Sequence, residues 1–264
     1  MCKNLVSVER YDRIALVRFD KSDSANALSF SLMRELTAVA EDLANDPNLC
    51  AVVLTGRDDN FCLGMDLKDS EVSQSATANL SERRKALKTG PRMCDAWEKI
   101  EAITIVAIEG WCAGGGAALA VSCDLRVFAD SSYFYVPEIE RGFNMSWGSV
   151  PRITNLVGPA KAKRIIVLAE KVSATSAKKW GIADYIVAKG DAVDKAMQIA
   201  THAACLPPNS VHICKSAINA HSNVLNGATS HADMDQFALM QNSDDCAEGV
   251  QAFLEKRDPV YKGN

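Results

Sequence analysis

A glycine cluster at the end of an apolar run is the part of this sequence best suited to chemistry. Gly114, Gly115 and Gly116 follow a run that reads as a strand, and the small residues after them read as the start of a helix. Glycine lets a backbone approach a ligand because it has no Cβ. The amides of a first helical turn have no partner inside the helix. Together these properties predict a site for a negatively charged oxygen.

A carboxylate that could move protons follows at Glu138, directly after Val136 and Pro137 at the end of another apolar strand. Beside an apolar pocket its proton affinity would rise, which suits general acid/base work. From the residues alone a purely structural role, in which Glu138 hydrogen-bonds a local turn, stays open.

The turn Leu63-Gly64-Met65-Asp66 is a candidate for a second oxyanion donor. An oxyanion site usually takes two amide donors from different segments of the chain. A strand that ends in one glycine is common, however, so this segment taken alone reads as a plain turn.

The elements that must position these residues alternate between strand and helix in the first half of the chain. Apolar runs at 51–55, 103–108 and 125–128 predict buried strands, and an amphipathic pattern at 29–45 predicts a helix. This alternation predicts an α/β fold with parallel strands. We expect a core over residues 1–200 and a helical region over residues 201–264. The polar residues 70–90 predict a mobile segment.

Composition excludes several classes of function. The chain has 264 residues, 48% apolar and 23% charged, which is typical of a globular protein. Its net charge of -4 argues against broad nucleic-acid binding. The sequence has no apolar run of about 18 residues, so no membrane span is predicted. Nine cysteines without a CxxC pair indicate free thiols in the cytoplasm, and four histidines without metal-ligand spacing indicate no metal site.

Eight stretches, in order and at matching spacing, carry a resemblance to one family. They are residues 24–28 (SANAL), 51–56 (AVVLTG), 61–68 (FCLGMDLK), 114–116 (GGG), 123–126 (CDLR), 134–139 (FYVPEI), 173–187 and 248–257 (EGVQAFLEKR). With them the chain resembles the crotonase (enoyl-CoA hydratase/isomerase) superfamily along nearly its whole length. The resemblance implies a spiral of ββα units with a helical C-terminal trimerisation region, and a homotrimer or a dimer of trimers.

The resemblance also implies a substrate and a site. The substrate is an acyl-CoA thioester, and no separate cofactor is expected because coenzyme A is part of that substrate. The thioester oxygen is bound by the backbone amides of Met65 and Gly115, with Glu138 as the catalytic carboxylate. The residues implied to contact the substrate are Ala25, Ala27, Leu63, Gly64, Asp66, Leu67 and Ala118. Phe253 and Lys256 lie in the tail region that can reach the nucleotide end of coenzyme A.

One departure from the family pattern bears on the reaction. Hydratases of the family usually carry a second glutamate two residues past the triple glycine, where this chain has Ala118. A double-bond shift needs only one carboxylate, so we expect an isomerase that converts 3-enoyl to 2-enoyl thioesters. A hydratase with an atypical second group and a non-catalytic acyl-CoA-binding protein remain alternatives. A serine hydrolase is disfavoured because the histidines lie late in the chain, away from any exposed-serine motif.

A second departure concerns the acyl pocket. Phe143, Met145 and Trp147 replace the glycine-rich turn that usually follows the carboxylate, and Ser146 stands where dienoyl isomerases place an aspartate. We expect Phe143 and Trp147 to contact the acyl group and to restrict the pocket. Core packing is an equally good explanation of these bulky residues.

Overall fold

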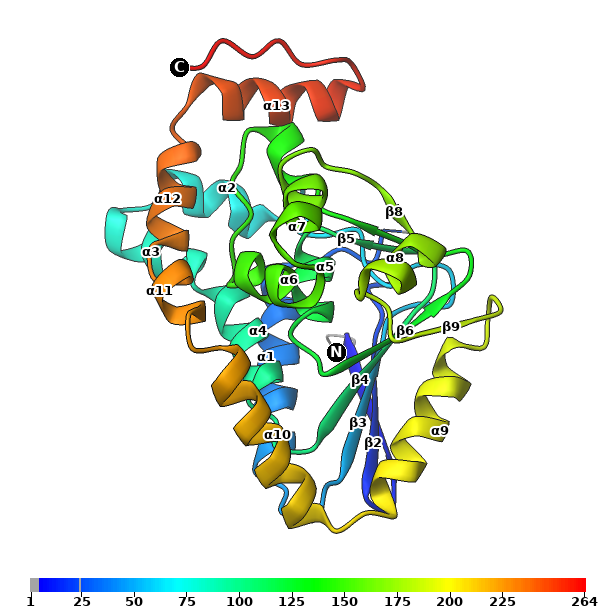
Figure 1. Ribbon diagram of the computed structural model, residues 1–264. Coiled ribbons are helices and arrows are strands. Elements are labelled where there is room, and N and C mark those ends of the chain that lie inside the picture. Colours follow the sequence, from blue (N-terminus) through cyan, green and yellow to red (C-terminus); the bar gives the residue numbers. More distant parts are fainter. Residues whose placement is uncertain (1–4, 24) are drawn as a thin grey trace.

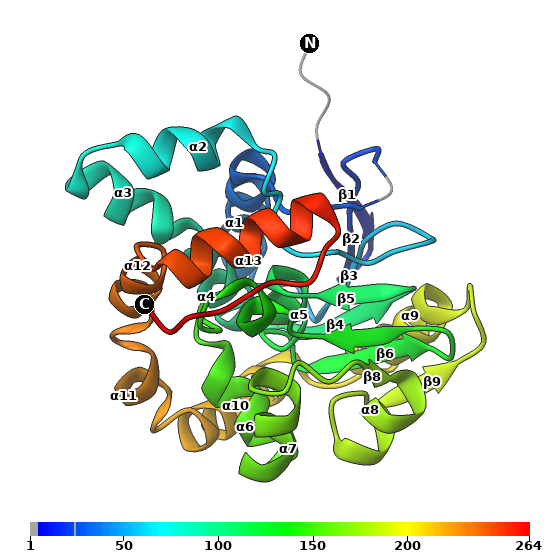
Figure 2. The same ribbon diagram turned by 90° about the horizontal axis from the view of Figure 1, so that it is seen from above.

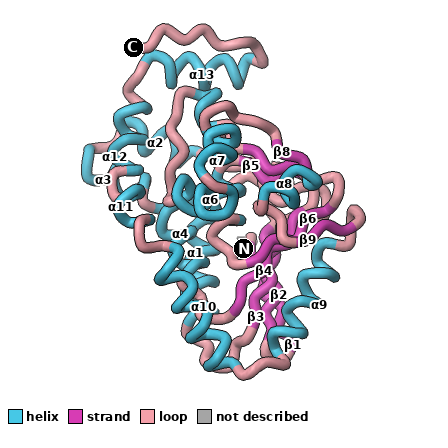
Figure 3. The backbone as a smooth tube through the Cα atoms, in the orientation of Figure 1, coloured by secondary structure: helices cyan, strands magenta, loops and turns pink. Residues whose placement is uncertain are grey.

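A six-stranded sheet forms the frame of the protein. The computed structural model of Figures 1 and 3 describes residues 5–23 and 25–264. In spatial order the strands are β1 (Val6–Tyr11), β2 (Ile14–Phe19), β3 (Ala51–Thr55), β4 (Ile103–Ile108), β6 (Leu125–Ala129) and β9 (Tyr185–Val187). β1 and β2 form an antiparallel hairpin, and the pairs from β2 to β9 are parallel. The parallel arrangement predicted from the alternating pattern is therefore confirmed.

A second, three-stranded sheet brings the glycine cluster close to Glu138. Its strands are β5 (Trp111–Ala113), β7 (Tyr133–Tyr135) and β8 (Val172–Ser173). β5 and β7 are parallel, with Ala113 opposite Tyr135. The next residue, Gly114, donates its N–H to the Tyr135 carbonyl at 2.9 Å. Because both strands end at the same edge, the residues that follow them, Gly115 and Glu138, leave the sheet side by side.

Helices flank the two sheets, and one of them, α9 (Ala192–Ala204), packs against β3, β4 and β6 of the large sheet. The bounds are α1 (Phe30–Ala44), α2 (Ser70–Thr77), α3 (Leu80–Leu87), α4 (Thr89–Glu98), α5 (Gly115–Ala120), the 3₁₀ helix η1 (Glu138–Arg141), α6 (Ser149–Val157), α7 (Pro159–Ile166), α8 (Ala174–Trp180), α9 (Ala192–Ala204), α10 (Pro208–Ser222), α11 (Asn226–Ser230), α12 (Asp233–Met240) and α13 (Asp244–Glu255). Figure 2 shows α13 lying across the top of the molecule, and α13 packs against η1.

Two apolar clusters cover the two faces of the large sheet. Along β3, Val52 and Leu54 belong to the larger cluster, while Ala51 and Val53 belong to the smaller one. The smaller cluster is completed by three buried alanines of α9, Ala192, Ala196 and Ala200. Burial on both faces explains why the β3 sequence is continuously apolar rather than alternating.

The polar residues 70–90, predicted to form a mobile segment, are helical. This stretch forms α2, α3 and the start of α4. The Asp69 carboxylate accepts a hydrogen bond from the Glu71 N–H, and the Asn79 side chain accepts one from the Glu82 N–H at 3.0 Å. Such side-chain caps satisfy orphan amides and start helices in polar sequence, so the segment forms a helical cover, and its mobility stays a prediction.

The C-terminal helices are fastened to the sheet by a buried lysine. Lys215 of α10 donates to the carbonyls of Ile100 and Ala102 at 2.7 and 2.9 Å and pairs with the Asp124 carboxylate at 2.6 Å. The predicted division at residue 200 falls inside α9, and both this division and trimerisation stay predictions. Among the described residues, no helix has the length and apolar character needed to span a membrane.

Candidate active site

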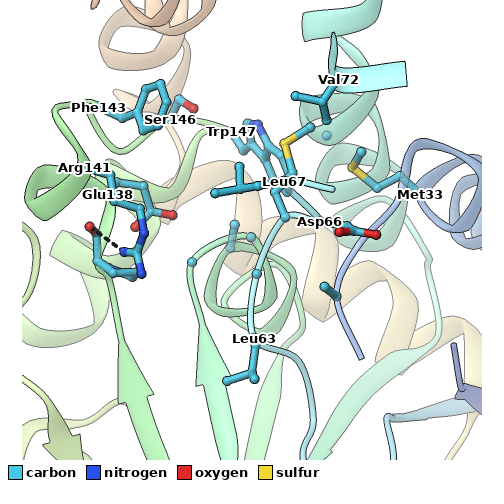
Figure 4. Close-up of a pocket in the computed structure, with 18 of the residues that line it drawn as sticks. Met33, Leu63, Asp66, Leu67, Val72, Glu138, Arg141, Phe143, Ser146 and Trp147 are labelled. Atoms are coloured by element: carbon cyan, nitrogen blue, oxygen red, sulfur yellow. Dashed lines mark hydrogen bonds between the residues drawn. The ribbon is translucent and has the colours of Figure 1, made fainter. Parts of the chain in front are cut away.

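A cavity of about 660 Å³ opens where the ends of the small sheet meet the helical cover (Figure 4). Its wall contains most of the residues that the sequence singled out for chemistry or for contact with substrate. These residues are Ala25, Ala27, Leu63, Gly64, Met65, Asp66, Leu67, Gly115, Ala118, Glu138, Phe143 and Trp147. Phe253 also lines the cavity, whereas Lys256 is exposed at the end of α13 and lies outside the lining.

Close backbone approach explains the glycines at the floor of this cavity. A Cβ on Gly64 would lie 3.5 Å from the Gly115 nitrogen, and one on Gly114 would lie 3.6 Å from the Gly64 Cα. Gly64 and Gly114 also have φ angles of +98° and +51°, which L side chains rarely adopt. The two turns predicted to supply amides are therefore in contact, although they are far apart in the sequence.

Two backbone amides at this contact have no protein acceptor. The loop between β3 and α2 is fixed by hydrogen bonds from Leu28 N to Gly64 O at 2.8 Å and from Asp66 N to Leu28 O at 3.0 Å. Between them, the Met65 N–H has no hydrogen bond to any described residue, and neither has the Gly115 N–H at the start of α5. An unpaired amide at a cavity wall is available to a ligand oxygen.

Glu138 presents its carboxylate to the same place. It is the first residue of η1, and a Cβ on Gly114 would lie 2.9 Å from its Oε1. The side chain is half-buried as a whole, but its Oε2 is fully buried and has no hydrogen-bond partner in the described chain. Burial raises the pKa of Glu138 to about 7, against smaller opposing effects from its own backbone amide and from Arg141. A carboxyl with this pKa can accept and return protons near neutral pH.

The other acidic side chains of the cavity are held differently. Among the described residues, the carboxylates in the wall are Asp23, Asp66 and Glu138. Lys21 forms ion pairs with both Asp66 and Asp23, the latter at 3.4 Å. Ala118, on α5, is buried and contributes only a methyl group. Among the wall carboxylates of the described residues, Glu138 is therefore the one without a lysine partner. On α5, the position where a second carboxylate could stand holds Ala118.

Trp147 forms the wall between α4 and α5. A Cβ on Gly90 would lie 2.1 Å from the Trp147 ring, and one on Gly115 would lie 2.7 Å from it, so the indole packs directly against both glycines. Trp147 itself has a φ of +59°. Arg152 holds this strained turn by donating to the Trp147 carbonyl at 2.9 Å. The bulky residue predicted for the acyl pocket thus lies beside the Gly115 amide.

Several lining residues were missed from the sequence because they come from the helical cover. They include Met33, Val72, Leu87, Met234, Phe237, Gln241 and Leu254. Phe237 of α12 stacks on Phe143 with ring centroids 4.9 Å apart. The caps at Asp69 and Asn79 could have revealed the helices α2 and α3. No local signal shows that α12 and α13 fold back over the cavity, because that arrangement depends on tertiary packing.

Comparison with known proteins decides the family. A family model described as enoyl-CoA hydratase/isomerase matches residues 9–264. The chain belongs to this family. A short-chain-enoyl-CoA hydratase of Clostridium acetobutylicum is 28% identical over 96% of each chain. A 2,3-dehydroadipyl-CoA hydratase of Escherichia coli is 28% identical over 97% of this chain and 98% of the other.

Solved structures of the family confirm the crotonase fold. A carnitinyl-CoA hydratase from Mycobacterium avium superposes with a TM-score of 0.85 at 30% identity, covering 99% of this chain and 100% of the other. An enoyl-CoA hydratase from Mycobacterium avium subsp. paratuberculosis has a TM-score of 0.87 at 20% identity, which shows the shared fold, over 98% of both chains. The protein is therefore an acyl-CoA-processing enzyme of the enoyl-CoA hydratase/isomerase family.

Proposed function

We propose that this protein is an enoyl-CoA isomerase that moves a double bond from the 3- to the 2-position of an acyl-CoA thioester, with Glu138 as its single proton carrier. The observation that carries the proposal is the Glu138 carboxylate, whose buried Oε2 has no partner within the described residues and which faces the Gly114 turn. Across α5 the corresponding hydratase position is Ala118, which can neither accept nor donate a proton.

The reaction follows from this placement in two proton transfers. The Glu138 carboxylate removes a proton from C2 of the 3-enoyl thioester, and the electrons of that C–H bond form a dienolate whose negative charge lies largely on the thioester oxygen. The protonated Glu138 then returns the proton to C4, and the remaining electrons form the C2–C3 double bond and restore the carbonyl. No water is consumed, and Glu138 ends as it began.

The amides of Met65 and Gly115 are assigned to the thioester oxygen. An enolate oxygen carries more charge than a thioester oxygen, so fixed N–H dipoles stabilise the intermediate more than the substrate. One such donor contributes about 3 kcal/mol to lowering the barrier. We assign Ala25, Ala27, Leu63, Gly64, Asp66 and Leu67 to the coenzyme A path, and Ala118, Phe143 and Trp147 to the acyl group.

Hydration of a 2-enoyl thioester is the second candidate. It is favoured by the names of the relatives from Clostridium acetobutylicum and Escherichia coli, which are hydratases. Hydration requires a group that orients and deprotonates water while a proton is delivered to C2. Glu138 could do one of these tasks, and a group other than Ala118 would have to do the other.

The test supplies hex-3-enoyl-CoA and hex-2-enoyl-CoA separately in deuterated water and follows products by mass spectrometry. We expect hex-3-enoyl-CoA to become hex-2-enoyl-CoA, and Glu138→Gln to abolish this conversion. Glu140→Gln is the matched control, because Glu140 lies on the same turn but is exposed and outside the cavity. Formation of 3-hydroxyhexanoyl-CoA as the main product would select the hydratase instead. Tight binding of both thioesters without conversion would refute both reactions.

We also propose that the chain assembles as a homotrimer or a dimer of trimers and acts in the cytoplasm. Large apolar side chains stand exposed on and beside α10, including Ile213, Ile218 and Leu225 at 69%, 66% and 70%. Exposed apolar patches are typical of subunit contacts. Light scattering on the purified protein measures the number of subunits, and a monomer would contradict this part of the proposal.

A further inference from the structure

The cavity wall contains an arginine that has no ion-pair partner within hydrogen-bond distance among the described residues. Of its basic residues, Lys21 is paired with Asp23 and Asp66, and Lys68 is exposed to solvent. Arg141, the last residue of η1, is only partly exposed, and its hydrogen-bond and ring contacts with described residues, a carbonyl and an aromatic ring, include no ion pair. Because the cavity is largely apolar, the charged guanidinium of Arg141 is available to bind an anionic group of a ligand.

Arg141 lies on the same side of η1 as Glu138. Side chains three residues apart on a 3₁₀ helix eclipse one another, separated by about 6 Å along the axis. Figure 4 shows the two side chains next to each other on the cavity wall. The charge of Arg141 also acts on Glu138, where it opposes part of the rise in pKa caused by burial. Arg141 is therefore within one helical turn of the carboxylate assigned to proton transfer.

The protein uses little of the hydrogen-bonding capacity of this guanidinium. Its Nη1 donates to the Pro137 carbonyl at 3.0 Å, and the group stacks over the Phe253 ring at 4.1 Å from the centroid. A guanidinium has five N–H donors, and no other bond from it to a described residue is present. Phe253 covers one face, so water is partly displaced there, and an anion in the plane of the group would gain from the lowered dielectric.

We infer that Arg141 selects acyl-CoA substrates whose acyl chain carries a second negative charge, a carboxylate beyond the carbons that react. This inference rests on the proposed function, because it takes Glu138 as the position of C2 and C4. The phosphates of coenzyme A are separated from the thioester by the whole pantetheine arm. An anion within one helical turn of Glu138 therefore belongs to the acyl part. Bidentate recognition by the planar fork would fix that carboxylate while the chain crosses the site.

Binding separates this inference from catalysis. The probes are adipyl-CoA and hexanoyl-CoA, which have equal chain length, no double bond to convert, and differ in the terminal carboxylate. Calorimetry on the wild-type chain is expected to give tighter binding of adipyl-CoA. Arg141→Gln should weaken the binding of adipyl-CoA about 10- to 100-fold, the loss expected for a charged hydrogen-bonded pair. The preference for adipyl-CoA over hexanoyl-CoA should then disappear.

Two further variants test whether the guanidinium of Arg141 itself causes the preference for adipyl-CoA. Arg141→Lys keeps the charge without the planar fork and should retain part of the preference for adipyl-CoA. Phe253→Leu removes the stacked ring but keeps the guanidinium and an apolar side chain over it, so the ratio of the two affinities should stay close to that of the wild type. If Phe253→Leu removes the preference as fully as Arg141→Gln does, the guanidinium only anchors α13 and the inference is wrong.

Other outcomes distinguish its failure from that of the proposed function. Equal affinity of the wild type for both thioesters, together with conversion of hex-3-enoyl-CoA, overturns the role of Arg141 and leaves the isomerase standing. An equal loss of affinity for free coenzyme A in Arg141→Gln would also overturn it, because the anion recognised would then be a phosphate. An Arg141-dependent preference for adipyl-CoA without turnover of either hexenoyl isomer would support the acyl-carboxylate site and refute the isomerase.

Discussion

Replacing Glu138 by glutamine should make the protein more stable as well as inactive. The physical reason is that the folded state buries an ionisable carboxyl whose Oε2 has no hydrogen-bond partner in the described chain. Burial raises the pKa of Glu138 from 4.5 to about 7. A carboxyl with a raised folded-state pKa stabilises the fold only while it is protonated, so stability is lost as the pH rises from the unfolded value through the folded one.

The magnitude follows from the two pKa values. One pKa unit corresponds to about 1.4 kcal/mol, so the cost of ionised Glu138 is about 1 kcal/mol at pH 5, about 2 at pH 6 and about 3 at pH 7, where it begins to level off. Glutamine does not titrate. The measured quantity is the free energy of unfolding of Glu138→Gln minus that of the wild type. Relative to its value at pH 4, this difference should therefore increase by these amounts.

The assay is urea denaturation of both proteins at intervals between pH 4 and pH 8, with Glu140→Gln as the control for loss of an exposed carboxylate. Because the measured quantity is the pH dependence of a difference, any constant effect of the amide cancels. A difference that stays flat across this range would refute the burial of an ionisable Glu138, and with it the explanation of how this residue serves as a base at neutral pH.

The remaining predictions concern the pH dependence of the rate, the reaction catalysed, the packing around Trp147 and the ion pair of Lys215. The kcat/KM of isomerisation should rise about tenfold per pH unit below pH 7 and level off above it, since the base must be ionised; a flat profile from pH 5 to 8 would count against Glu138 as the base. Ala118→Glu should introduce hydration, seen as 3-hydroxyacyl-CoA by mass spectrometry, and no product would show that the missing carboxylate is not the reason. Gly90→Ala should lower the free energy of unfolding by about 1–3 kcal/mol because the methyl would lie 2.1 Å from the Trp147 ring. Adding Trp147→Ala should remove most of that cost in a double-mutant cycle, and simple additivity of the two effects would argue against the clash. Lys215→Met should lower the same quantity by about 3–5 kcal/mol, because it removes the cation from the largely buried Asp124 carboxylate, which keeps only its hydrogen bonds from Thr104 among the described residues; a change under about 1 kcal/mol in urea denaturation would show that α10 is held by other contacts.

Much of the fold could be predicted from the sequence where local patterns are strong. The strands at 51–55 and 103–108 are short apolar runs, and the helix begun by Ser29 has a side-chain cap and one apolar face. The cover formed by α2 and α3 could not be read from apolar periodicity, because its sequence is polar and its start depends on two side-chain caps. Glu138 follows the strand β7, as expected, but the sequence did not show that it begins the helix η1 or that η1 packs against α13.

By itself the sequence determined the α/β class, the family motifs and the absence of a glutamate at Ala118, because these follow from residue types at fixed spacing. Tertiary structure alone decided that Gly64 and Gly114 touch and that the carboxyl of Glu138 is buried enough to titrate near 7. It also decided that Arg141 faces the cavity under Phe253. Proximity between distant segments and the removal of water from a charge are properties of packing, and no short stretch of sequence contains them.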